Sequence, residues 1–253
     1  SFLGHLDDLR RVLFWSLAAV VVGMIIASQF APAMLAVLKY PLRVAGRNPE
    51  TFLRTMTVTG AMNVAIMVIF WGGLLISLPV VTIIVGKYIM AALSPKERNA
   101  VYLWSGLAVL MFMVGVAIAF YGVMPPAIKV MLWFNEWLGV TIEFVTVNDY
   151  IAFCLVMMVV FGVMFEIPVV LLFLGHLGIV KSAQLRSARR YVIVALLILS
   201  MVLTPTTDPF TQLVLAVPLT ILYELCIWII WLRERRAKSR IEDAPLMSRD
   251  DAE

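Results

Sequence analysis

The sequence predicts an all-α integral membrane protein built as a bundle of six transmembrane helices. Of its 253 residues, 62% are apolar and only 14% are charged, against about 45–50% and about 25% in an ordinary soluble domain. The apolar residues form long runs without charge, and about 20 such residues in a helix cross the hydrocarbon core of a bilayer. Composition and patterning together exclude a soluble domain.

Six apolar segments follow one another along the chain. The fifth in chain order, residues 191–203, has roughly 13 residues, fewer than the roughly 20 that a straight crossing needs. It can cross only where the bilayer thins or the helix sits in a recess. The other five are long enough to span a bilayer, and they comprise residues 12–30, 61–85, 101–124, 150–174 and 212–232.

Prolines mark two of the segment ends. Pro125 and Pro126 are expected to close the third segment, because proline lacks the backbone N–H that a helix interior needs. Only residues 204–211 separate the last two segments, and Pro205 and Pro209 within them predict a tight helical hairpin. Residues 126–138 read either as an amphipathic helix on the membrane surface or as a helix packed on the bundle.

The distribution of basic residues predicts the orientation in the membrane. The N-terminus, the second and fourth loops and the tail carry 15 of the 20 Lys and Arg residues, and the other three loops carry 5. The positive-inside rule therefore places both termini in the cytoplasm, although four basic residues in the first loop oppose the trend. This asymmetry explains the net charge of +4 without nucleic acid. The predicted division is a membrane domain over 1–232 and a disordered cytoplasmic tail over 233–253.

The motifs of common enzymes and cofactor sites do not occur in the sequence. There is no phosphate-binding GxxxxGK[ST] loop, no HExxH zinc motif and no GxSxG, and His5 and His176 lie far apart. Cys154 and Cys226 both fall within apolar segments and read as buried thiols. The expectation is a protein that is not an enzyme and that needs no cofactor or metal.

Two carboxylates lie inside apolar segments. Glu166 is in the fourth segment with Pro168 two residues later, and Glu224 is in the sixth. A charge at the bilayer centre costs about 2.5–3.5 kcal/mol on insertion scales, so Glu166 should face the bundle interior, a wet cavity or a partner. It is either a hydrogen-bonding group between helices or a functional polar site within the membrane. Glu224 lies nearer the basic tail and is expected to be structural.

Several short motifs, in this order along the chain, resemble the TatC family, the polytopic core subunit of the twin-arginine protein translocase. Each motif is weak alone, and their order and spacing across six spans are specific. They are HLDDLR at residues 5–10, Pro41-Leu42, Pro79-Val80, Leu93 with Lys96-Glu97-Arg98, Phe165-Glu166-Ile167-Pro168, Arg189-Arg190-Tyr191, and Thr204-Pro205 with Asp208 and Gln212.

The resemblance implies a concave, glove-like bundle with short fifth and sixth helices in the cytoplasmic membrane. It implies a receptor for Arg-Arg signal peptides of folded proteins, which works with single-span TatA and TatB partners, and with other copies of itself, under the proton-motive force. The signal-binding residues implied are Asp8, Arg10, Tyr88, Glu97 and Arg98. Residues implied to be structural are Pro41, Pro168, Pro205, Asp208 and Glu224.

The chemistry of the implied sites agrees with this function. An Arg guanidinium matches a carboxylate in a bidentate manner, so Asp8 and Glu97 suit an arginine pair. Exposed ion pairs contribute only about 0–1 kcal/mol each, so the apolar stretch of the signal should also bind, near Glu166. For partner helices the expected docking residues are Met201, Thr204 and Gln212. The alternative is that the last two merely cap the hairpin.

Two other functional classes remain as alternatives on the sequence alone. A proton-coupled secondary transporter of a small solute would use Glu166 as its proton site, although no internal repeat is visible. An intramembrane enzyme would need a nucleophile and a base, and no such pair can be named.

Overall fold

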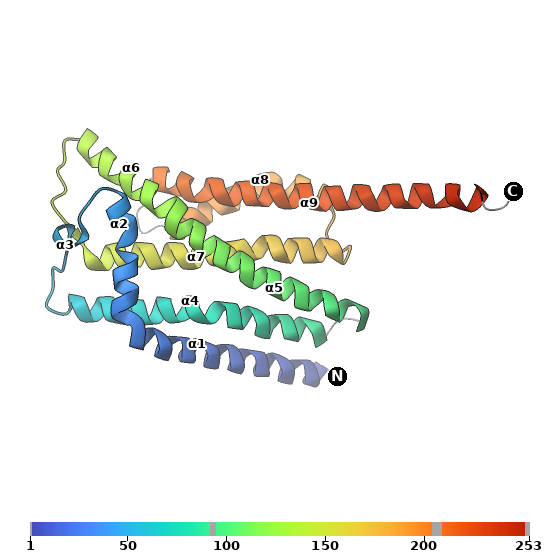
Figure 1. Ribbon diagram of the computed structural model, residues 1–253, viewed down its shortest axis with the longest axis horizontal. Coiled ribbons are helices and arrows are strands. Elements are labelled where there is room, and N and C mark those ends of the chain that lie inside the picture. The colour runs from blue at the N-terminus through green and yellow to red at the C-terminus, as the bar shows by residue number, and fades with distance from the viewer. Residues whose placement is uncertain (1, 92–94, 204–208, 251–253) are drawn as a thin grey trace.

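The computed structural model describes residues 2–91, 95–203 and 209–250, with side chains in 7–88, 103–201, 212–213 and 216–236. Helices that run roughly parallel or antiparallel form one bundle (Figure 1). The long ones are α1 (Phe2–Leu38), α4 (Gly60–Ala91), α5 (Pro95–Ala117), α7 (Val147–His176), α8 (Ser182–Leu203) and α9 (Pro209–Asp250). The shorter elements are α2 (Tyr40–Val44), α3 (Pro49–Phe52), α6 (Met124–Trp137), the π-helix η1 (Ile118–Val123) and the strands β1 (Leu53–Arg54) and β2 (Val145–Thr146).

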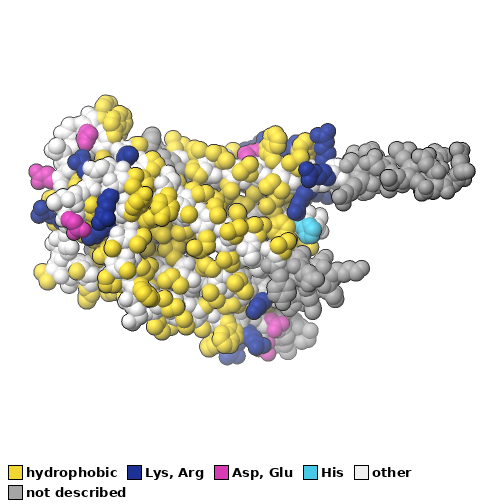
Figure 2. All heavy atoms as spheres, in the orientation of Figure 1, with side chains coloured by type: hydrophobic (Ala, Val, Ile, Leu, Met, Phe, Trp, Pro, Cys, Tyr) yellow, Lys and Arg dark blue, Asp and Glu magenta, His cyan; other side chains and the backbone are white. Residues whose placement is uncertain are grey.

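The two ends of the bundle differ in what they contain. The start of α1, the end of α4 and the C-terminus of the chain lie at one end, here called the termini end (Figure 1). The opposite end, here called the cap end, holds α2, α3 and the last turns of α6. Apolar side chains cover the surface between the ends, and charged side chains gather at both (Figure 2). This distribution is typical of a membrane-spanning bundle.

The described helices confirm the predicted membrane fold. Five stretches are long and apolar enough to cross a bilayer: Asp7–Val44, Gly60–Tyr88, Leu103–Trp137, Val147–His176 and Ala216–Arg236. Helix α8 is not among these five. Its 22 residues include a polar first half, residues 182–190, and only the short apolar stretch predicted from the sequence.

The third span does not end at Pro125 and Pro126, as the sequence predicts. Helix α5 passes through η1 into α6, and both prolines lie in the first turn of α6. A proline removes one backbone N–H donor and crowds the carbonyl four residues earlier. The wider i→i+5 turns of η1 accommodate this change, so the helix continues through the prolines.

Helix α9 continues beyond residue 232, the boundary expected between the membrane domain and the tail. Helix α9 runs unbroken to Asp250, so the expected boundary at residue 232 falls inside it. Residues 233–240 are mostly Arg, Glu, Lys and Ala, which are good helix formers. Glu234 also precedes Lys238 by four residues, the spacing that favours a helical ion pair.

Close backbone contact joins α1 to α4. A Cβ atom added at Gly73 would lie 2.6 Å from the Cα of Met24, and one added at Gly23 would lie 2.4 Å from the carbonyl oxygen of Gly73. Helices in membranes gain most of their association energy from such close packing, because lipid is as apolar as a leucine side chain. The glycines therefore fix the α1–α4 contact.

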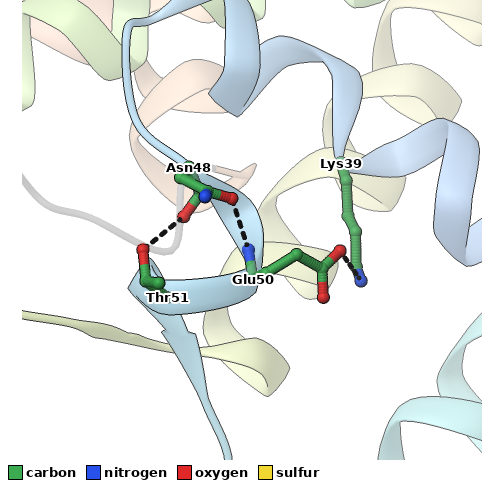
Figure 3. Close-up of polar contacts among 4 residues, drawn as sticks. All are labelled: Lys39, Asn48, Glu50 and Thr51. Atoms are coloured by element: carbon green, nitrogen blue, oxygen red, sulfur yellow. Dashed lines mark hydrogen bonds and ion pairs between the residues drawn. The ribbon is translucent and has the colours of Figure 1, made fainter.

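Polar contacts hold the cap end together. Lys39 forms an ion pair with Glu50 at 3.0 Å, next to Asn48, whose side chain accepts a hydrogen bond from the Glu50 N–H and so caps α3 (Figure 3). Arg47 reaches across to Glu136 of α6 at 2.9 Å. Two of the four basic residues of the first loop therefore have carboxylate partners, which explains why they are tolerated on the side with few cations.

The first and third loops are also joined through backbone groups. Strands β1 and β2 pair in parallel, with Leu53 opposite Val145. The buried hydroxyl of Tyr150, at the start of α7, donates a hydrogen bond to the carbonyl oxygen of Leu38 at the end of α1, over 2.7 Å. Helix α6 buries Ala127, Ile128 and Leu132 against the bundle, which favours the packed reading of this segment over the surface helix.

Candidate functional site

The segments that carry the predicted signal-binding residues come together at the termini end. Asp8 and Arg10 are exposed on α1, and Tyr88 is half-buried near the end of α4. Residues 97 and 98 lie in the first turn of α5, with side chains outside the described set. Helix α4 packs against both α1 and α5, so these three segments form one edge of the bundle (Figure 1).

Asp8 has no cationic partner among the described side chains. The three ion pairs of the described residues join Lys39 to Glu50, Arg47 to Glu136 and Arg189 to Glu224. The exposed carboxylate of Asp8 is thus available to a cation brought by a ligand. A guanidinium group could bind it through two parallel hydrogen bonds.

Glu166 is a residue of α7, faces α4 and is half-buried. The hydroxyl of Thr82 on α4 donates a hydrogen bond to its Oε1 over 3.1 Å. Glu166 stands ten residues before the end of α7 at His176, which is roughly 15 Å of helix at 1.5 Å per residue. The contact matches the interhelical hydrogen bond that the sequence left open, and the remaining exposure of Glu166 leaves room for the second, functional role.

Pro168 lies on a different side of α7 from this contact. It is buried and borders an apolar cavity of about 60 Å³ between α7, α8 and α9. Met164, Leu196, Leu219 and Cys226 also line this cavity. Glu166 is not part of its wall, so the intramembrane carboxylate and the cavity are separate features.

A series of polar contacts runs along the α8–α9 hairpin. At the termini end, Glu234 of α9 accepts hydrogen bonds from the N–H and the hydroxyl of Ser182. Further along, Arg189 of α8 and Glu224 of α9 form an ion pair at 2.6 Å. Glu224 therefore has a partner on the neighbouring helix, which suits the structural role expected for it. This pairing could be predicted from the sequence, because Arg189 and Glu224 lie nearly the same number of residues before and after the turn that joins the two helices.

The residues expected to dock a partner helix lie at the other end of this hairpin. Met201 is 55% exposed. Gln212 donates a hydrogen bond from Nε2 to the carbonyl oxygen of Leu197 over 2.8 Å, so its amide nitrogen ties α9 to α8. Thr204, Pro205 and Asp208 lie outside the described residues. Pro41, expected to be structural, is buried in the first turn of α2.

Comparison with known proteins gives consistent matches over most of the chain. Residues 4–218 match the family model of the Sec-independent protein translocase protein (TatC). The chain is 32% identical over 234 residues to the TatC protein of Aquifex aeolicus, covering 92% of this chain and 96% of that protein. It is 30% identical over 241 residues to the chloroplastic TATC of Arabidopsis thaliana, covering 93% and 67%.

A solved structure has the same fold. The crystal structure of a twin-arginine translocase receptor, TatC, superposes with a TM-score of 0.80 at 33% sequence identity. The match covers 90% of this chain and 98% of that one.

Proposed function

Because this chain belongs to the TatC family of Sec-independent protein translocase proteins, we propose that it is the signal-peptide receptor of a twin-arginine translocase. As a member of this family it is a translocase component and not an enzyme. Family membership also favours this function over the alternative, a small-solute transporter that uses Glu166. Cargo would be folded proteins whose signal peptides carry an Arg-Arg pair, exported under the proton-motive force.

The observation that carries the proposal is the meeting of three segments at the termini end. The start of α1 and the adjoining ends of α4 and α5 form one edge (Figure 1), and Asp8 on that edge is exposed and forms no described ion pair. Asp8 and Glu97 would bind the two signal arginines, and the ring of Tyr88 would lie against a guanidinium. Arg10 and Arg98, on the same edge, would hold the carboxylates of Asp8 and Glu97 in position.

The apolar stretch of the signal peptide supplies the remaining affinity. Exposed ion pairs contribute only about 0–1 kcal/mol each, whereas about 25 cal/mol is gained for each Å² of apolar surface removed from water. We assign this stretch to the face near Glu166, where the half-buried carboxylate offers a polar contact within an otherwise apolar surface.

The bundle would lie in the cytoplasmic membrane with both termini in the cytoplasm. The 15 to 5 division of basic residues supports this orientation through the positive-inside rule. The two termini share one end of the bundle (Figure 1), as the orientation requires. Partner subunits of the TatA and TatB type would dock their single helices beside Met201, Thr204 and Gln212, and further copies of this chain would complete the receptor.

Photo-crosslinking of a signal peptide tests the receptor role. A peptide that carries Arg-Arg and a photoreactive residue should be captured by the membrane-embedded protein, and the matching Lys-Lys peptide should be captured much less. Asp8→Ala and Glu97→Ala should each weaken capture by up to about fivefold, the equivalent of about 1 kcal/mol for an exposed pair.

Glu143→Ala is the matched control, because Glu143 is an exposed carboxylate in the third loop, far from the termini end. Capture by this variant should equal that of the wild type. Equal capture of the Arg-Arg and Lys-Lys peptides, or unchanged capture by the Asp8→Ala, Glu97→Ala double variant, would rule out the assignment.

A further inference from the structure

A second cationic surface lies on the α8–α9 hairpin, across the bundle from α1 (Figure 1). We call it the arginine–tryptophan patch, and it comprises Arg186, Arg190, Tyr191, Trp228, Trp231 and Arg235. The guanidinium carbon of Arg186 lies 5.6 Å from the centroid of the Trp231 ring, and that of Arg235 lies 5.4 Å from the same centroid. Two cations from two helices therefore converge on one indole.

The positive charge of this patch is not neutralised by the described part of the chain. Arg186, Arg190 and Arg235 take part in none of the ion pairs among described side chains. Of the carboxylates in the hairpin, Glu224 forms an ion pair with Arg189. Glu234 accepts hydrogen bonds from the neutral Ser182 and keeps its charge, so the three arginines of the patch still leave it net positive. Figure 2 shows Lys and Arg side chains gathered part of the way along α9, at the end of the apolar surface of the bundle.

The arginines are held in place by aromatic rings. Arg190 stacks over Tyr191 with its guanidinium carbon 4.8 Å from the ring centroid. Trp228 contacts Trp231 edge to face, with 6.3 Å between the ring centroids. A cation over an aromatic face is attracted by the ring quadrupole. Arg190 also donates a hydrogen bond to the Tyr191 hydroxyl over 3.0 Å, whereas Arg186 and Arg235 face Trp231 and form no ion pair with a described carboxylate. The patch is therefore ordered and able to bind an anion.

The surroundings of the patch define the chemistry of that anion. The apolar run of α9 ends at Leu232 and is followed by Arg233, Glu234, Arg235 and Arg236, so Arg235 and its neighbour Arg186 lie where hydrocarbon gives way to water. Directly below them Trp228 is 59% exposed, Leu225 52% and Val194 54%. A ligand that satisfies both surfaces needs an anionic head and a hydrocarbon chain. A free phosphate ion or a soluble acidic protein would leave the apolar part uncovered.

We propose that the arginine–tryptophan patch is a binding site for the phosphate-bearing head group of an anionic phospholipid. Arg186 and Arg235 would bind the head-group phosphate, because the planar guanidinium presents parallel donors that match phosphate oxygens. The acyl chains would run along Leu225, Trp228 and Val194. The site is independent of the signal-binding edge, which is built from α1, α4 and α5.

Native mass spectrometry of the full chain, released from vesicles that contain phosphatidylglycerol and phosphatidylcholine, tests the site. The wild type should retain phosphatidylglycerol in preference to phosphatidylcholine. The double variant R186Q/R235Q should lose this preference by roughly thirtyfold in apparent affinity, as about 1 kcal/mol per interfacial arginine implies. Both side chains are exposed, so the variant should fold, and thermal unfolding in detergent checks this.

The double variant R43Q/R54Q is the matched control. Arg43 and Arg54 are exposed at the cap end and take part in no ion pair among the described side chains, so the same net charge is removed far from the patch. This variant should retain phosphatidylglycerol as the wild type does. Equal loss in both double variants would show a general charge effect and overturn the proposal. Displacement of the lipid by inorganic phosphate at equal concentration would assign the site to a free anion and overturn it as well.

Discussion

The hydroxyl of Thr82 on α4 donates a hydrogen bond to the carboxyl group of Glu166 on α7 over 3.1 Å, although the two residues are 84 apart in the sequence. It gives the intramembrane carboxylate a polar neighbour, which an apolar bundle must supply because lipid cannot. The carboxylate is still half exposed. The same contact can therefore anchor two helices and position Glu166 toward a ligand.

A double-mutant cycle on this pair should give a measurable coupling energy. Thr82→Val removes the hydrogen-bond donor and leaves the Glu166 carboxyl group without this partner. Glu166→Gln keeps an oxygen that can accept the same hydrogen bond. The free energy of unfolding should therefore fall more in Thr82→Val than in Glu166→Gln. Interhelical hydrogen bonds in membranes contribute about 0.6–1.7 kcal/mol, and we expect a coupling between Thr82→Val and Glu166→Ala in this range. Unfolding by denaturant in detergent micelles measures it, and strictly additive effects would show that the two side chains act separately.

The orientation predicts where an added cysteine can be labelled. Gln184→Cys lies on the termini-end side of α8 and should react with a membrane-impermeant maleimide only after the cytoplasmic membrane is opened. Glu143→Cys, in the third loop, should react in intact cells. Both positions are exposed, whereas the native Cys154 and Cys226 are buried and should stay unlabelled. The reverse pattern of labelling would invert the topology.

Substitution of glycine should separate close packing from helix propensity. Gly73→Ala places a Cβ atom 2.6 Å from the Cα of Met24, and forcing the helices apart should cost about 1–3 kcal/mol. The midpoint of thermal unfolding in detergent should fall. Gly106→Ala is the control, since its added Cβ has no neighbour within 4 Å apart from the backbone of its own helix. There the gain in helix propensity of about 0.5–1 kcal/mol should leave stability equal or higher.

The hairpin of α8 and α9 should contact partner helices near Met201. A photoreactive residue at this exposed position should capture a TatA- or TatB-type protein in cells that make both. Gln212 uses one of its two N–H donors for Leu197, so Oε1 and the second N–H can serve a partner. Gln212→Leu should weaken docking by about 0.6–2 kcal/mol without abolishing it. As a control, a probe at Ile66, which is 57% exposed on α4, should capture lipid. Capture of lipid alone at Met201 would place the docking surface elsewhere.

Much of the fold could be predicted from composition because a bilayer imposes one strong rule. A run of about 20 apolar residues must be a spanning helix, and this rule located the five long spans and the short apolar part of α8. Alternation of the helices then places Asp8, Tyr88 and residue 97 at one end of the bundle. To predict that these residues share one end of the bundle, only the number of membrane crossings between them has to be known.

The errors and omissions arose where local rules compete with distant contacts. A pair of prolines ends most helices, and only the wider turns of η1 let this helix continue. The Arg47–Glu136 pair joins residues 89 apart, and no spacing rule links two loops so distant. Thr82 is one of many hydroxyls in apolar segments, and nothing in the sequence distinguishes it as the partner of Glu166.

The π-helical turn at Ile118–Val123 should allow the third span to lose one residue without moving the helices on either side of it. A π-turn holds one residue more than an α-turn would need between the same two flanking helices. Deleting one residue there should close the turn into ordinary α-helix and leave α5 and α6 close to their present positions. In α7 the same deletion before Glu166 would rotate the rest of the helix by about 100°, because one residue advances an α-helix by that angle. Glu166 would then point away from Thr82, so the two spans differ in whether they can absorb a change of one residue.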